Sequence, residues 1–170
     1  MVENEESLLR LVWHSADFDK DGNLKGAAFS PGDLIPKTDK DGCPKYVSMD
    51  LRRSISKASV DWNVSRSGKG SGSGRDKRVN PRFALFNTGE LRSAVDTEGS
   101  LMFVVREFPV AADEIDVGSP ENLAHVGVCS NTPAPVDEHA VELKVNELRT
   151  ALLELCREIL DYETVFGPVE

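Results

Sequence analysis

The fold is decided by the stretch from residue 138 to residue 162, EHAVELKVNELRTALLELCREILDY. Its apolar residues are spaced four and three apart in alternation, at Val141, Val145, Leu148, Leu152, Leu155, Ile159 and Tyr162. That spacing keeps an apolar stripe on one face of a helix. Asp137 stands before the stretch as a typical N-cap residue, and Gly167-Pro168 follows it as a stop signal. The pattern predicts a long helix over residues 137–163.

The stripe allows two kinds of packing. A seam only two residues wide per heptad is typical of a coiled coil, whereas a helix lying on a sheet shows a wider apolar face. Four further residues widen this one, namely Leu143, Leu153, Cys156 and Leu160. Packing on the protein's own sheet is therefore favoured, and a homodimer through residues 141–162 is the alternative.

The rest of the chain shows mostly short β patterns between turn signals. Residues 8–14 are an apolar run that fits a strand or a helix, and residues 53–64 fit a helix. Strands are predicted over residues 45–51, 83–86, 91–95, 101–108 and 123–129. We expect an α+β domain spanning residues 1–170, in which a small antiparallel meander of about 4–6 strands packs against the long C-terminal helix.

Composition excludes several classes of protein. The chain has 170 residues, of which 39% are hydrophobic and 29% charged, and this mixture indicates one globular domain. Its net charge of −9 and pI of about 4.9 disfavour general nucleic-acid binding and attachment to anionic membranes. No apolar run approaches the roughly 20 residues that span a bilayer. We therefore predict no membrane association.

The cysteines and the first residues bear on the cellular compartment. The three cysteines, Cys43, Cys129 and Cys156, have neither metal-ligand spacing nor an even number. Residues 1–6 are acidic, whereas a secretory signal needs a basic start. Reduced thiols in a cytoplasmic protein are the expectation.

One segment is basic, although the chain as a whole is acidic. Residues 65–80 are rich in glycine and serine, which indicates a flexible loop. Between residues 66 and 82 six cations oppose Asp76 alone, a local charge of +5, and they are Arg66, Lys69, Arg75, Lys77, Arg78 and Arg82. No aromatic residue lies among them, so stacking on single-stranded nucleic acid is not indicated. We interpret the six cations as a docking surface for a protein partner, or locally for a phosphate backbone.

Alternate aspartates precede a glycine near the N-terminus. Asp17, Asp19 and Asp21 lead into Gly22, an order that resembles the calcium loop of EF-hand proteins. The twelfth position of such a loop is Ala28 here, where a bidentate glutamate is needed. Asp-Lys-Asp-Gly also occurs again at residues 39–42, which favours simple turn chemistry. A weak divalent-cation site is the alternative, and no other cofactor is expected.

Candidate catalytic residues are few. Of the three histidines, His125 is predicted on a strand, and His14 lies at the end of the first apolar run. No assembled catalytic motif is present, so no catalytic residue is assigned. An enzymatic alternative is a small metal-dependent hydrolase or group-transfer toxin that uses His14, His125 and the carboxylates of Asp17–Asp21.

Four short pieces carry a resemblance. Leu9-Arg10, Asp21-Gly22, Ala28-Phe29 and residues 122–126 (NLAHV) follow one another in an order that resembles small bacterial single-domain proteins of no assigned activity. The opening Leu-Arg also looks like the start of ADP-ribosyltransferase domains, but their Ser-Thr-Ser strand and catalytic glutamate motif are not recognisable. The resemblance implies a bacterial single-domain protein and no function. The leading hypothesis is a non-catalytic protein-binding or regulatory module that docks through residues 66–82, the long helix, or both.

Overall fold

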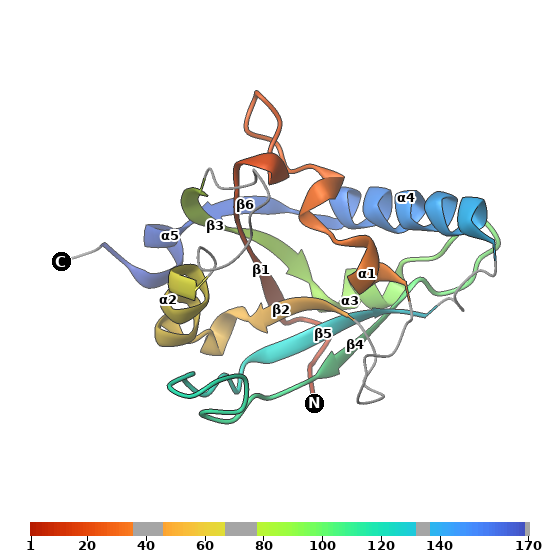
Figure 1. Cartoon of the computed structure of the whole chain (residues 1–170). Helices are drawn as coiled ribbons and strands as arrows, with labels where there is room; N and C mark the ends of the chain where they lie inside the picture. The colour runs from red at the N-terminus through yellow and green to blue at the C-terminus, as the bar shows by residue number, and fades with distance from the viewer. Residues whose placement is uncertain (36–45, 67–77, 132–136, 169–170) are drawn as a thin grey trace.

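The computed structural model describes residues 1–35, 46–66, 78–131 and 137–168, and it gives the backbone without the side chains for residues 13–15 and 78–79 (Figure 1). No helix within these ranges is long and apolar enough to cross a membrane.

Six antiparallel strands form one sheet, in the order β4-β5-β2-β1-β3-β6. They are β1 Ser7–His14, β2 Val47–Leu51, β3 Arg78–Asn87, β4 Phe103–Glu107, β5 His125–Ser130 and β6 Glu158–Asp161. The α+β class and the predicted size of the sheet are confirmed. The expected meander is wrong, because β1 lies in the middle of the sheet and β3 and β4, which follow one another in the chain, lie far apart in it.

Five helices and three short 3₁₀ turns accompany the sheet. The helices are α1 Pro31–Leu34, α2 Lys57–Arg66, α3 Thr88–Ser93, α4 Glu138–Leu155 and α5 Tyr162–Phe166. The 3₁₀ turns are Ser15–Asp17, Gly26–Ala28 and Arg52–Ser54. The strand predicted over residues 91–95 is wrong, because α3 occupies most of that segment. Asn87 caps α3 by accepting a hydrogen bond from the Glu90 backbone N–H at 3.1 Å.

The long helix α4 begins where predicted and ends earlier. The Asp137 carboxylate accepts a hydrogen bond from the Ala140 N–H at 3.0 Å and caps its start. Beyond Leu155 the chain becomes extended, and β6 pairs with the outer edge of β3, where Leu160 stands opposite Phe83. An open sheet edge leaves backbone groups unpaired, and β6 satisfies them. The predicted extension of the helix to residue 163 is therefore wrong.

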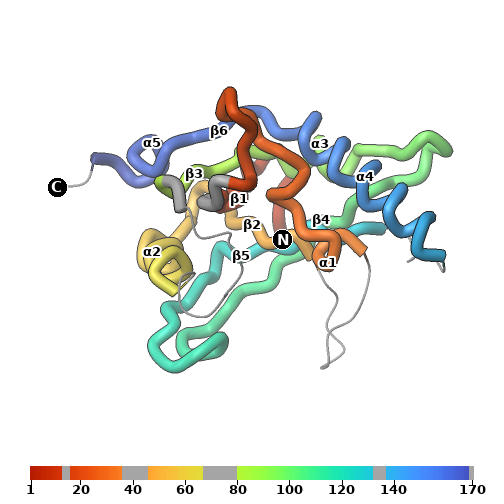
Figure 2. Tube along the Cα trace, turned by 45° about the horizontal axis from the view of Figure 1, so that its top comes forward, coloured from red at the N-terminus to blue at the C-terminus, as the bar shows by residue number. Residues whose placement is uncertain are grey.

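The two faces of the sheet are covered by different helices (Figure 2). On one face Val145, Leu148 and Leu152 of α4 are buried in the larger apolar core. On the other face a smaller core contains Val60 of α2, and α5 packs against it. Successive residues of β1 divide between the two cores, as the alternation of a strand requires, with Leu8 in the larger and Leu9 in the smaller. The predicted packing of the long helix on the sheet is confirmed.

Candidate functional site

A cavity of about 260 Å³ lies on the face of the sheet that carries α2. Its floor is formed by Leu11, Ser48, Asp50 and His125 of the strands. One wall is α2, and the other is the connection between β4 and β5, which runs beside α2 (Figures 1 and 2). The described lining is completed by Arg10, Ser59, Val60, Trp62, Asn63, Val110, Ile115, Pro120 and Asn122.

The register of β2 and β5 brings the polar floor residues together. Asp50 stands opposite His125, and Ser48 stands opposite Gly127. Residues two apart on a strand share a face, so Ser48 and Asp50 both point to the side of the sheet that His125 occupies. The residues between them, Val47, Met49 and Leu51, are buried on the opposite face. The apolar alternation of β2 thus fixes which of its side chains are available to the cavity.

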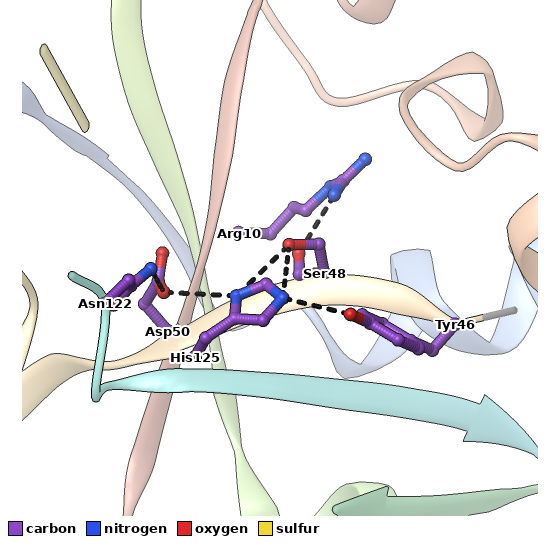
Figure 3. A network of polar contacts seen from close by, with 6 residues as sticks. All are labelled: Arg10, Tyr46, Ser48, Asp50, Asn122 and His125. Carbon is purple, nitrogen blue, oxygen red and sulfur yellow. Dashed lines mark hydrogen bonds and ion pairs between the residues drawn. The ribbon is translucent and has the colours of Figure 1, made fainter. Parts of the chain in front are cut away.

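His125 lies at the centre of a polar cluster (Figure 3). Its Nδ1 is 3.5 Å from the Asp50 Oδ1, and its Nε2 is 3.4 Å from the Tyr46 hydroxyl. The Ser48 Oγ is 3.5 Å from Nδ1 and 3.4 Å from Nε2. These distances are at the long end of the hydrogen-bond range. The imidazole therefore has a carboxylate on one nitrogen, a phenol on the other, and a serine hydroxyl near both.

Asp50 is held by Asn122, a residue of the β4–β5 connection. The Asn122 amide donates to the Asp50 Oδ1 at 2.7 Å, and this bond also fixes which amide atom is nitrogen. The Asn122 backbone is anchored by two hydrogen bonds with Val110, of 2.8 and 3.0 Å. The residue is 8% exposed, and its Oδ1 accepts no hydrogen bond within the described part of the chain. A buried acceptor without a donor is costly and rare.

Arg10 fills a split between β1 and β2. β1 pairs with β2 at Leu8, opposite Leu51, and at Leu9, opposite Asp50. Beyond that point the Arg10 Nη1 donates to the Ser48 carbonyl at 2.9 Å, and Nη2 donates to the Ala28 carbonyl at 3.3 Å. Its Nε is buried and has no acceptor among the described residues. Burial lowers the pKa of Arg10, although nearby carboxylates, Asp50 among them, favour the charged form.

Gly127 makes room for the aromatic residue that reaches His125. The rings of Tyr46 and Phe108 are stacked at 4.4 Å with an interplanar angle of 5°. A Cβ on Gly127 would be 2.5 Å from the Phe108 Cε2 and 2.7 Å from the Tyr46 Cγ. Only glycine therefore allows the stacked pair to lie on the sheet at this point, with the Tyr46 hydroxyl near the imidazole.

An exposed ion pair joins α2 to the β4–β5 connection beside the cavity. Arg66, at the end of α2, lies 3.1 Å from the Asp116 carboxylate of the β4–β5 connection. Its guanidinium also lies 4.2 Å from the centre of the Trp62 ring. Both Trp62 and the neighbouring Ile115 line the cavity. Arg66 thus ties the two walls together at the surface.

No known protein family, curated protein or solved structure matches this chain.

Two of the six cations predicted to bind a partner have described side chains. Arg66 forms the contact with Asp116. The Arg82 Nε lies 3.8 Å from the Asp161 carboxylate, and the guanidinium carbon of Arg82 lies 5.1 Å from the centre of the Phe18 ring. Arg78 is described by its backbone alone, as the first residue of β3. Lys69, Arg75 and Lys77 lie outside the described residues, as does most of the predicted flexible loop.

The predicted aspartate site is a turn in the structure. The Asp19 carboxylate accepts hydrogen bonds from the backbone N–H groups of Asp21 and Asn23, both at 2.8 Å, and from the Asn23 amide at 3.0 Å. The Asn23 amide bond is the main cause that lowers the pKa of Asp19. No group of three or more histidine, cysteine or carboxylate side chains that could hold a metal is found in the described ranges. Cation binding by Asp17, Asp19 and Asp21 stays a prediction.

Of the two candidate histidines, the structure places His125 in the cavity. The backbone of His14 pairs with Arg78 at the end of β1, and its side chain is not described. The described lining contains none of Asp17, Asp19 and Asp21. The structure therefore brings His125 together with carboxylate Asp50, which the sequence analysis did not single out.

Sequence reasoning missed Ser48, Asp50, Asn122 and Arg10. A signal for the first two was present, because polar and apolar residues alternate along β2. Alternation predicts a polar face and cannot tell a solvated face from one that lines a cavity. The partner of that face, the β4–β5 connection, is irregular and has no periodic pattern to reveal where it packs.

Proposed function

We propose that this chain binds a small organic molecule in the cavity around His125. The observation that carries the proposal is a cavity of about 260 Å³ whose lining includes the polar side chains of Ser48, Asp50 and His125. Pockets that bind small molecules combine apolar walls with a few polar groups that fix orientation. Here Val60, Trp62 and Ile115 supply apolar wall, and the cluster around His125 supplies the polar end.

The size of the cavity limits the ligand. Sites for drug-sized molecules occupy roughly 300–1,000 Å³, and this cavity has about 260 Å³. The occupant is therefore a small metabolite-sized molecule that lies between α2 and the β4–β5 connection.

The chemistry of the lining favours an uncharged polar end. Asp50 already accepts from Asn122 and faces His125, and Arg10 already donates to two carbonyls. A charged ligand would have to be buried without a free counter-charge, which is costly. The Ser48 hydroxyl and the Asn63 amide, which also line the cavity, can form hydrogen bonds with an uncharged polar group. We expect a ligand with an amide, amine-derived N–H or hydroxyl at one end and an apolar remainder.

The test is a set of small probes read on His125 by NMR. Acetamide, isobutanol, isobutyramide and isobutyrate are added separately at millimolar concentration to the full chain with ¹⁵N-labelled histidine. The amides and the alcohol are expected to move the His125 ring signals and leave those of His139 in place, and isobutyrate is expected to act least. His139 lies on the exposed first turn of α4 and serves as an internal control.

A cavity-filling variant provides the matched control. In Asn63→Trp the larger side chain enters the cavity and is expected to abolish the probe response. In Asn146→Trp the same substitution is made at an exposed position of α4, and the response is expected to stay. Probe-induced shifts that persist in Asn63→Trp, or the absence of shifts for every probe, would contradict the proposal.

A second candidate function is docking of an acidic protein partner through residues 66–82. It is favoured by a charge of +5 within a chain of net charge −9. Changing Arg75, Lys77 and Arg78 together to glutamine is expected to abolish capture of a partner from a bacterial lysate, and unchanged capture would remove this surface. The regulatory role and the cytoplasmic location of such a module stay predictions.

Self-association through the long helix is less well supported than its packing within one chain. Val145, Leu148 and Leu152 of the apolar stripe are buried in the chain's own core. Leu143 on the flank is 58% exposed and is the residue of α4 that remains for a second copy.

A further inference from the structure

We infer that Ser48 is an acyl-transfer nucleophile, with His125 as its general base and Asp50 as the group that orients the histidine. The inference rests on the proposed function, because the acyl donor has to enter the same cavity. Ser48, His125 and Asp50 all line it. The reaction class is hydrolysis of a small ester or amide through an acyl-serine.

The three groups have the order that this chemistry needs. A nucleophilic serine requires a base within reach and a third group that holds the base. The Ser48 Oγ lies 3.4 Å from the His125 Nε2, and the Asp50 Oδ1 lies 3.5 Å from Nδ1 on the other side of the ring. Such a constellation is recognised by geometry and roles, whatever the chain order or fold.

The contacts are longer than those of a working triad. Catalytic hydrogen bonds span about 2.6–3.2 Å and are often looser in structures without substrate. The Ser48 Oγ is also about as close to Nδ1 as to Nε2, so a rotation about its Cα–Cβ bond is needed to aim it at Nε2. The Tyr46 hydroxyl lies 3.4 Å from the same nitrogen and is the competing partner before substrate enters.

Neighbouring groups fit the supporting roles. The hydrogen bond from the Asn122 amide holds the Asp50 carboxylate beside His125, where it faces the imidazolium that forms during the reaction. Arg10 donates to the carbonyl of Ser48 itself, and its Nε is a buried N–H without an acceptor. Arg10 therefore fixes the β2 backbone at the nucleophile.

The reaction needs no reagent other than the substrate and water. His125 takes the proton of the Ser48 hydroxyl while Oγ forms a bond to the substrate carbonyl carbon, and the carbonyl oxygen becomes an oxyanion. When the oxyanion collapses, the bond to the leaving alcohol or amine breaks, and the leaving group takes the proton from His125. A water molecule then attacks the acyl-serine with His125 again as base, which releases the carboxylic acid and restores Ser48.

The experiment uses a fluorophosphonate with a short alkyl group on the full chain. Its phosphorus is attacked by an activated serine Oγ, and fluoride leaves. Mass spectrometry of the intact protein and of its peptides is expected to show one adduct, on Ser48. The labelling rate is expected to fall at least about 100-fold in His125→Gln, the scale of general-base catalysis. Ser93→Ala is the matched control, because Ser93 is an exposed serine of α3 outside the cavity lining and its loss is expected to leave the rate unchanged.

Two further variants keep the test independent of folding. Ser48→Ala is expected to remove the adduct, and Ser48→Cys is expected to react with iodoacetamide in place of the fluorophosphonate, again depending on His125. Circular dichroism and the melting temperature show that each variant is folded. The absence of an adduct in the unaltered chain overturns the inference, as does an adduct that persists in Ser48→Ala or forms at an unchanged rate in His125→Gln.

The outcomes separate this inference from the proposed function. If the neutral probes move the His125 signals and Ser48 is not labelled, the cavity binds ligands and Ser48 is not a nucleophile. If neither occurs, both proposals fail.

Discussion

At the scale of single residues, a glycine decides the geometry around His125. Gly127 lies directly beneath the stacked rings of Tyr46 and Phe108, and a Cβ there would overlap both. The stacked pair covers the sheet where the glycine leaves it bare, and it carries the Tyr46 hydroxyl to the imidazole. Gly127 thus positions the Tyr46 hydroxyl, although it has no side chain of its own.

Gly127→Ala is expected to lower the free energy of unfolding by about 1–3 kcal/mol, the usual cost of overpacking. The reason is that Tyr46 and Phe108 have to move away from the added methyl group. Urea denaturation measures the loss. In Gly32→Ala a Cβ would meet its nearest neighbour at 3.6 Å, an ordinary contact, and the free energy is expected to change by less than about 0.5 kcal/mol. Equal effects of the two substitutions would show that the stacked pair is not held against Gly127.

At the scale of secondary-structure elements, α4 shows how far a sequence pattern predicts structure. The cap at Asp137 and the buried stripe residues follow directly from the spacing of apolar residues. The end of the helix does not follow, because Ile159 and Leu160 suit a helix and a strand equally well. Pairing with β3 decides between the two, and it is a contact distant in the sequence. Helix α3 shows the same limit, because a strand was predicted over residues 91–95 and most of that segment is helical.

Leu148→Ala is expected to cost about 2–5 kcal/mol of unfolding free energy, because a fully buried leucine of α4 is replaced by a cavity. Leu143→Ala, five residues earlier on the same helix, removes a side chain that is 58% exposed and is expected to cost less than about 0.5 kcal/mol. Urea denaturation of the two variants provides the comparison. A large loss in Leu143→Ala that grows with protein concentration would instead indicate a second copy on that flank.

The candidate site was predictable only in part, for the same physical reason. His125 was singled out because histidine is rare in this chain and lies on a predicted strand. Its partners Ser48 and Asp50 became visible only with the register between β2 and β5. Asn122 and Arg10 depend on an irregular connection and on a split in the sheet, and neither has a periodic sequence signal.

At the scale of the whole molecule, several carboxylates stabilise the fold only while they are charged. Hydrogen bonds from the Asn23 side chain lower the pKa of Asp19, and the Arg157 side chain lowers that of Glu90. The backbone N–H of Ser100 does the same for Asp96. Since the folded pKa lies below the unfolded one, each contribution is complete at neutral pH and is lost as the pH falls through the folded pKa.

We therefore expect the melting temperature to fall between about pH 5 and about pH 2, and the fall to be shallower in the triple variant Asp19→Asn, Glu90→Gln, Asp96→Asn. Amides keep the acceptor oxygen and cannot be protonated in this range. Calorimetry across the pH series measures both curves, with Glu142→Gln at an exposed position of α4 as control. Parallel curves for the triple variant and the unaltered chain would assign the acid sensitivity to other groups.

The position of β6 has a consequence for how the molecule forms during synthesis. β3 and β6 are neighbours in the sheet, yet β4, β5 and α4 all lie between them in the chain. A ribosome adds about 5–20 residues per second, so the outer edge of β3 stays open for seconds after β3 has left the exit tunnel. Open strand edges recruit other chains. During that interval the growing polypeptide is most exposed to aggregation, and a holding chaperone would protect it best at β3.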